Sequence, residues 1–270
     1  MFLRKLRIIV AGVALIAAPA AAQAATGSSL KVGYEISLGG LSFGEIQLEA
    51  QLDDEAYDLD ALLETKGLAD IFFHSVFKLA SQGAFAGEHV RPARFLSDFS
   101  NKNSARTVEL IYGPNGDPRM TAEPPYEDGF GAGISARARR GTQDPVSALL
   151  VPMSAGALQP CNRSLPVFDG RRRYNIQLTY DADTLMTGGP ESYTGKAVRC
   201  RVKFVPVAGY ERKKFLEMLR TNDDIRIWLA PIRGGQLYVP VRLSFRTPFG
   251  GAVARATRFI VSDPQRAAAK

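Results

Sequence analysis

Few side chains in this 270-residue sequence could act as a catalytic base. The only imidazoles belong to His74 and His89, and a hydrolase triad needs one of them beside a nucleophile and a carboxylate. His74 stands in an aromatic-rich stretch, which is typical of a half-buried structural residue, and His89 stands in a turn-like stretch before Pro92. The sequence therefore favours a protein that is not an enzyme.

Paired acids and a glycine-rich segment offer other kinds of chemistry. The acid clusters at 53–55 and 223–224 could divide acid and base roles as in glycosidases. Both interrupt the strand pattern, however, which favours turns. Residues 129–133 resemble a phosphate-binding loop only superficially, because no Lys-Ser or Lys-Thr follows. We expect no cofactor, and no metal site either, because neither histidine lies near a cysteine in sequence.

The two cysteines, Cys161 and Cys200, suggest a covalent cross-link. In an oxidising compartment such an isolated pair is most simply a disulfide, and a closed loop of about 40 residues would contribute roughly 3 to 4 kcal/mol. Two buried free thiols are the alternative.

The N-terminal segment predicts export. Arg4, Lys5 and Arg7 precede an uncharged, alanine-rich run that ends at Ala22-Gln23-Ala24. This is the order of a secretory signal peptide over residues 1–24, and the apolar run is too short for a spanning helix. No cysteine follows the expected cleavage site, so we expect a periplasmic protein that is not a lipoprotein, with no transmembrane segment in its mature chain.

The charge of the expected mature chain, 25–270, is mildly basic. Without the signal peptide it has 31 lysines and arginines against 27 acids, a net charge near +4. The densest basic clusters are Arg137, Arg139 and Arg140, and 171–173. They could face a membrane or an anionic polymer, although solvated loops are the simpler interpretation. An exported protein is not expected to bind nucleic acid.

Alternating apolar and polar residues predict strands over most of the chain. The segments 30–38, 41–52 and 57–62 alternate in this way and predict an antiparallel meander. Alternation resumes after Pro92, at 93–101 and 106–112, and again in the C-terminal half. We expect one mainly β domain over 25–270, formed by a curved antiparallel sheet or a partly open barrel with one or two short helices.

Three segments depart from this pattern. A helical spacing at 68–73 predicts a short helical turn. Residues 120–141 are rich in Pro, Gly and Arg and predict a flexible loop or linker. Asp144 followed by Pro145 has the form of a helix start, so we expect a short helix over 144–150.

Aromatic residues are concentrated in one part of the sequence. Within 28 residues lie Phe72, Phe73, Phe77, Phe85, Phe95 and Phe99. Core packing is the simpler explanation, but a curled sheet could instead present these rings to an apolar ligand such as a lipid acyl chain.

Several motifs resemble a family of bacterial envelope proteins, domain of unknown function 3108. They comprise 34–45, 144–150, 165–174, Cys200-Arg201-Val202, 227–229 and 239–243. The resemblance implies an exported, mostly antiparallel β domain and supplies no catalytic residues.

These observations lead to a functional hypothesis. We expect a non-enzymatic envelope protein that binds a lipid-like or protein partner and supports envelope integrity. The alternative is an assembly scaffold without a ligand cavity, which would use exposed sheet edges or the 120–141 loop. A cell-wall hydrolase is the third hypothesis.

Overall fold

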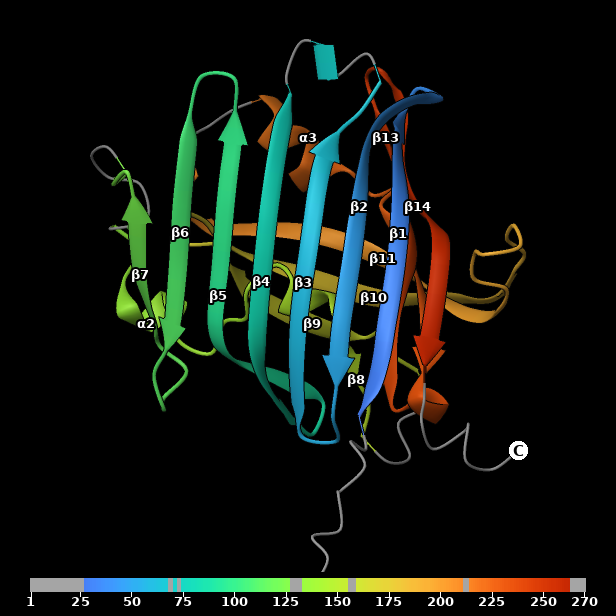
Figure 1. Ribbon diagram of the computed structural model, residues 1–270, viewed down its shortest axis with the longest axis horizontal. Helices are drawn as coiled ribbons and strands as arrows, with labels where there is room; N and C mark the ends of the chain where they lie inside the picture. The colour runs from blue at the N-terminus through green and yellow to red at the C-terminus, as the bar shows by residue number, and fades with distance from the viewer. Residues whose placement is uncertain are drawn as a thin grey trace, which may run out of the picture.

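The computed structural model describes residues 27–67, 70–71, 74–126, 133–154, 159–210 and 214–262. They form one 14-stranded sheet whose neighbouring strands are antiparallel, in the order β7-β6-β5-β4-β3-β2-β1-β14-β13-β12-β11-β10-β9, with β8 paired to β13 (Figure 1). The strands are β1 Ser28–Leu38, β2 Leu41–Leu52, β3 Ala56–Thr65, β4 Ser75–Ala86, β5 His89–Asn101, β6 Ala105–Tyr112, β7 Pro118–Glu123, β8 Val151–Pro152, β9 Arg163–Phe168, β10 Arg173–Met186, β11 Gly195–Ala208, β12 Arg226–Ile232, β13 Leu237–Thr247 and β14 Gly250–Ser262. This confirms the predicted fold class.

The period of two in the sequence decides which face of each strand is buried. In β1, Leu30 and Val32 are 0% and 2% exposed, whereas Lys31 between them is exposed and pairs with Glu49 of β2. Successive side chains point to opposite faces of a sheet. The same alternation along β2 and β3 gives the sheet one continuous apolar face.

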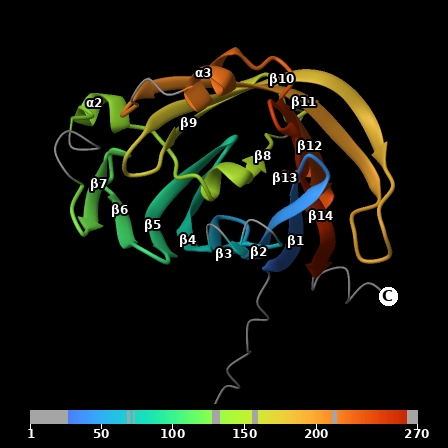
Figure 2. The same ribbon diagram turned by 90° about the horizontal axis from the view of Figure 1, so that it is seen from above.

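The sheet curls so that this apolar face lines an interior. In Figure 2 it runs from β7 through β1 and β14, then returns above through β13 to β9. The short 3-10 helix η1, Ser147–Leu149, and strand β8 lie inside the curl. No described ladder joins the edge strands β7 and β9, so the barrel stays open.

A segment of the interior chain bridges the two edges of the sheet. The Gly141 amide donates to the carbonyl of Gly116, in the turn between β6 and β7, at 2.9 Å. Two residues later, Gln143 exchanges backbone hydrogen bonds with Pro166 and Phe168 of β9. The opening that strand pairing leaves is thus partly covered by residues 141–143.

The structure corrects the prediction for residues 120–141. Strand β7 continues to Glu123, and helix α2 occupies Ala136–Arg139 with a cap from Ser135. Residues 127–132 of that segment lie outside the described residues.

The helix expected over 144–150 is only the single turn η1. The N-cap position is Val146 rather than Asp144, although the Asp144 carboxylate accepts the amides of Val146 and Ser147 at 2.9 and 2.8 Å. The longer helix prediction is wrong because Leu150 already has extended backbone and leads into β8.

The structure also bears on the helical turn expected at 68–73 and on the strand expected after Pro92. Of the turn expected at 68–73, only Asp70 and Ile71 are described, and they are helical. Pro92 does not bound β5 but lies within it, where the register against β4 shifts between Gln82 and Gly83. Such irregularities accommodate a proline that cannot donate to the ladder.

A disulfide cross-links the part of the sheet formed by β9 to β11. A disulfide joins Cys161, just before β9, to Cys200 in β11, with their Cα atoms 5.8 Å apart. Helix α3, Lys214–Thr221, contacts β11. Within the described part of the chain, no helix combines the length and apolar character needed to cross a bilayer.

Candidate functional site

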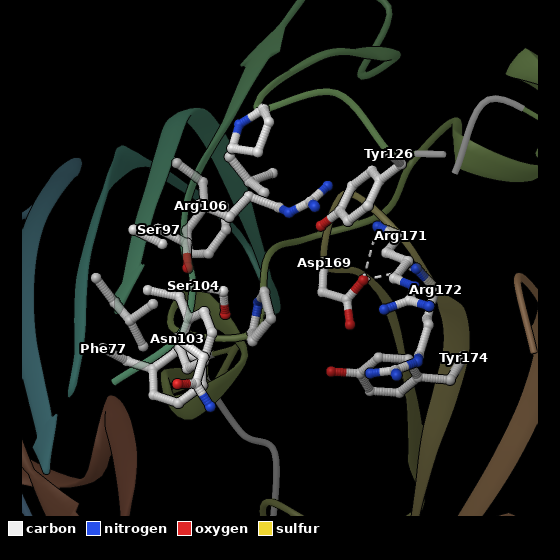
Figure 3. Close-up of a pocket in the computed structure, with 17 residues that line it drawn as sticks. Phe77, Ser97, Asn103, Ser104, Arg106, Tyr126, Asp169, Arg171, Arg172 and Tyr174 are labelled. Atoms are coloured by element: carbon white, nitrogen blue, oxygen red, sulfur yellow. Dashed lines mark hydrogen bonds between the residues drawn. The ribbon is translucent and has the colours of Figure 1, made fainter. Parts of the chain in front are cut away.

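A pocket of about 810 Å³ lies between strands β4 to β6 and the turn that joins β9 to β10 (Figure 3). One wall is apolar and the other carries charge. The lining residues are Phe77, Leu79, Phe95, Ser97, Phe99, Asn103, Ser104, Ala105, Arg106, Val108, Pro124, Tyr126, Pro145, Asp169, Arg171, Arg172 and Tyr174.

The apolar wall follows from strand register. Phe77 of β4 and Phe99 of β5 are direct partners in the ladder, and their ring centroids lie 4.6 Å apart. Phe95 lies four residues before Phe99 on the same face of β5, is 2% exposed and also lines the pocket. Three rings from two neighbouring strands therefore line the same side of the pocket.

The charged wall combines residues that are distant in sequence. Arg106 comes from the inward face of β6, whereas Arg171 and Arg172 come from the β9–β10 turn. The ring of Tyr126 connects them, with its centroid 4.4 Å from the Arg106 guanidinium and 5.6 Å from that of Arg171. Cation–π contacts of this kind hold guanidinium groups in place.

Asp169 supplies the carboxylate of this wall. Its Oδ1 accepts the backbone amides of Arg171 and Arg172 at 2.8 and 2.6 Å, so the acid stabilises its own turn. Desolvation raises the pKa of Asp169, and these hydrogen bonds oppose the shift. The side chain thus shapes the turn that presents both arginines.

Gly170 brings the turn close to β6. Its φ is +90°, and a Cβ atom there would lie 2.4 Å from a methyl group of Val108. Only glycine allows both the backbone conformation and this approach. The arginines of the turn are thereby held opposite Arg106.

A buried polar cluster lies behind Pro145 of the pocket wall. Asp144 is fully buried, and its Oδ2 accepts the Ser81 hydroxyl at 2.8 Å. Desolvation is the main cause that raises the pKa of Asp144. Burial and the charge of Asp144 also raise the pKa values of Tyr57 and Tyr112. No cation pairs with Asp144 among the described side chains, so only hydrogen bonds stabilise its charge.

The six phenylalanines singled out by the sequence do not form one surface. Phe77, Phe95 and Phe99 line the pocket. Phe85 lies elsewhere and packs against Tyr57 at 5.5 Å between centroids. Phe72 and Phe73 lie outside the described residues. Ligand binding by these rings stays a prediction.

Neither histidine is among the residues that line the pocket. His74 is exposed and contacts Asp70 at 2.8 Å, and His89 is exposed at the start of β5. Gly40-Leu41-Ser42-Phe43-Gly44 has the G-x-S-x-G form of a hydrolase motif. It lies in the β1–β2 hairpin rather than in a strand-to-helix turn. Among the described residues, no group of His, Cys, Asp or Glu side chains could hold a metal ion.

Two components of the site were missed at the level of sequence. Arg106 lies on the same face of β6 as the buried Val108 and Leu110. The alternation along this strand could therefore have predicted that Arg106 faces the interior. Tyr126 had no such signal, because it follows β7 in an irregular segment. For the 171–173 cluster, solvated charge was the simpler of two interpretations. Arg172 is exposed, but Arg171 is half-buried at the pocket and Arg173 donates to the carbonyl of Ala138.

Comparisons with known proteins identify the family of this chain. The family model described as protein of unknown function (DUF3108) matches residues 33–257, so the chain belongs to that family. Among solved structures it is similar to a beta-barrel-like protein of domain of unknown function DUF1849 from Brucella abortus. That likeness has 10% identity and a TM-score of 0.47, and covers 88% of this chain and 98% of the other. No curated protein matches.

Proposed function

We propose that this protein is a non-enzymatic component of the bacterial periplasm that binds a lipid-like ligand, with the ligand's apolar chain in the pocket between β4 to β6 and the β9–β10 turn. The observation that carries the proposal is the wall formed by Phe77, Phe95 and Phe99 beside about 810 Å³ of open space. Core packing would have filled this space with side chains.

The size of the pocket suits an acyl chain. Sites for small ligands span about 300–1,000 Å³ and are mainly apolar. Each buried methylene contributes about 0.8 kcal/mol. A chain of about ten carbons therefore gains enough free energy to offset much of the cost of association.

The alternative function is an assembly scaffold that uses a sheet edge. Strand β9 is a poor candidate for strand addition, because Gln143 already bonds to its backbone at Pro166 and Phe168. Strand β7 has no described partner on its outer side. The pocket favours ligand binding over this alternative.

Isothermal titration calorimetry with ten-carbon ligands tests the proposal. Decanol and decanoate are titrated into wild type and into Ser97→Trp, where an indole enters the pocket from the inward face of β5. The matched control is Ser100→Trp on the outward face of the same strand, where the serine is exposed. We expect at least one ligand to bind wild type and the control, and neither to bind Ser97→Trp.

The design separates pocket occupancy from loss of folding. Circular dichroism must show native melting for both tryptophan variants. Failure of both ligands to bind wild type, or undiminished binding to a folded Ser97→Trp, would overturn the proposed function. In that case periplasmic crosslinking with and without β7 would test the scaffold alternative.

A further inference from the structure

We infer that the ligand of this pocket carries an anionic end group, a carboxylate or a phosphate, that binds to Arg106 together with Arg171 and Arg172. The inference rests on the proposed function and specifies its ligand class. It derives from the charge and hydrogen bonding of the wall opposite the phenylalanines.

The charges of the described residues that line the pocket do not balance. Among them, Arg106, Arg171 and Arg172 carry guanidinium groups, and Asp169 carries the one carboxylate. The Oδ1 of Asp169 already accepts the amides of Arg171 and Arg172. Even without Arg171, the guanidinium groups of Arg106 and Arg172 outnumber this carboxylate among the described lining residues. An anion entering the pocket would neutralise the excess of positive charge.

Arg106 is the donor most clearly available to a ligand. Its Nη1 is buried and has no hydrogen-bond partner among the described atoms, and the side chain has no described acidic partner. A buried donor left unpaired costs about 1–3 kcal/mol, and more when it is charged. A ligand oxygen at Nη1 would remove that cost.

The Tyr126 ring holds this donor in place. It lies 4.4 Å from the Arg106 guanidinium and 5.6 Å from that of Arg171, and Figure 3 shows the Arg106 side chain directed toward it. Planar guanidinium groups held in this way match the two oxygens of a carboxylate or phosphate. The donors are therefore arranged before the ligand arrives.

The two walls together define an amphiphile. The rings of Phe77 and Phe99 would contact an alkyl chain, and the arginines lie across the same cavity. A neutral alcohol would fill the apolar side but leave the guanidinium of Arg106 desolvated and unpaired. A cationic amphiphile would add like charge, which is still less favourable.

A ten-carbon series at pH 7.5 measures the role of charge. Calorimetry compares decanol, decanoate, decyl phosphate and decyltrimethylammonium at one ionic strength. We expect decanoate or decyl phosphate to bind at least about tenfold more tightly than decanol, and the ammonium compound to bind most weakly, following the energies of charge-assisted hydrogen bonds. The tighter of the two anions identifies carboxylate or phosphate as the natural end group.

Substitution of Arg106 locates the effect. Arg106→Gln should abolish most of the preference for the anion over decanol, because the charged donor that distinguishes the two ligands is gone. Arg106→Lys should restore part of the preference. Arg94→Gln is the matched control, because Arg94 lies outward on β5 in an exposed pair with Glu109. If Arg106→Gln does not fold, Arg172→Gln at an exposed position carries the same test.

The outcomes distinguish the two proposals. If decanol binds as tightly as both anions, or if a folded Arg106→Gln keeps the full preference, this inference is wrong while the proposed function stands. If no member of the series binds, the proposed function itself fails.

Discussion

The hydroxyl of Ser81 on β4 donates a 2.8 Å hydrogen bond to the carboxylate of Asp144, a residue 63 positions further along the chain. Asp144 belongs to the interior segment that bridges the edges of the sheet. This hydrogen bond therefore anchors the bridging segment to the first half of the sheet, and it lies directly behind the pocket.

We predict that Asp144→Ala is strongly destabilising. The change removes the acceptor for Ser81 and for two backbone amides, and leaves these donors buried. Each such donor costs about 1–3 kcal/mol, so we expect a loss of at least about 3 kcal/mol in urea unfolding. Ser100→Ala, an exposed position on β5, should change stability by less than about 0.5 kcal/mol. Equal effects of the two changes would refute the role of Asp144.

The pH dependence of stability should carry the signature of Asp144. Its pKa is raised in the folded protein by desolvation, so between the unfolded value of about 3.9 and the folded value the native state binds more protons. The contribution of Asp144 to the free energy of unfolding is therefore fully present below the unfolded pKa and is lost as the pH rises through the folded pKa. We expect the free energy of unfolding of wild type, minus that of Asp144→Asn, to fall as the pH rises above about 4. The subtraction removes the similar contribution of Asp169. A difference that rises with pH would contradict the assignment.

The disulfide should make a large contribution to stability. Cys161 and Cys200 are separated by 39 positions, and the chain-entropy model assigns about 3 to 4 kcal/mol to such a loop. Urea unfolding with and without reductant, and of the Cys161→Ala/Cys200→Ala double variant, should show this loss. In an unreduced sample unfolded in urea, a thiol reagent should find no free thiol. Two reactive thiols would show that the pair is not joined.

Arg163 should contribute to closure of the curl. Its Nη1 donates to the carbonyls of Glu88, in the β4–β5 turn, and Pro152 of β8, at 3.3 and 2.9 Å. Arg163→Met keeps much of the apolar stem and removes these bonds, so we expect a loss of about 2–3 kcal/mol in urea unfolding.

The matched control for Arg163 is Arg94→Met. It removes an exposed ion pair on the outer face of the sheet and should cost less than about 1 kcal/mol. If Arg163→Met and Arg94→Met lose equal stability, the hydrogen bonds of Arg163 do not stabilise the curled form of the sheet.

The sequence by itself determined the strands and their inward faces. Alternation in segments such as 30–38 and 41–52 reports directly which side chains leave water, and the structure reproduces those ranges closely in β1 and β2. It also predicted a disulfide between Cys161 and Cys200, which the structure contains. These properties follow from local chemistry, so they can be read without the fold.

Only the tertiary structure decided how the sheet curls and what its interior holds. Local sequence could not show that the 169–172 turn would meet β6, because that approach depends on the accumulated twist of the strands between them. For the same reason Arg106 and Arg171, 65 positions apart in sequence, meet at one aromatic ring. The phenylalanines were visible as a cluster in sequence, but Phe85 lies near the other end of β4 from Phe77 and packs against Tyr57, away from the three rings that line the pocket.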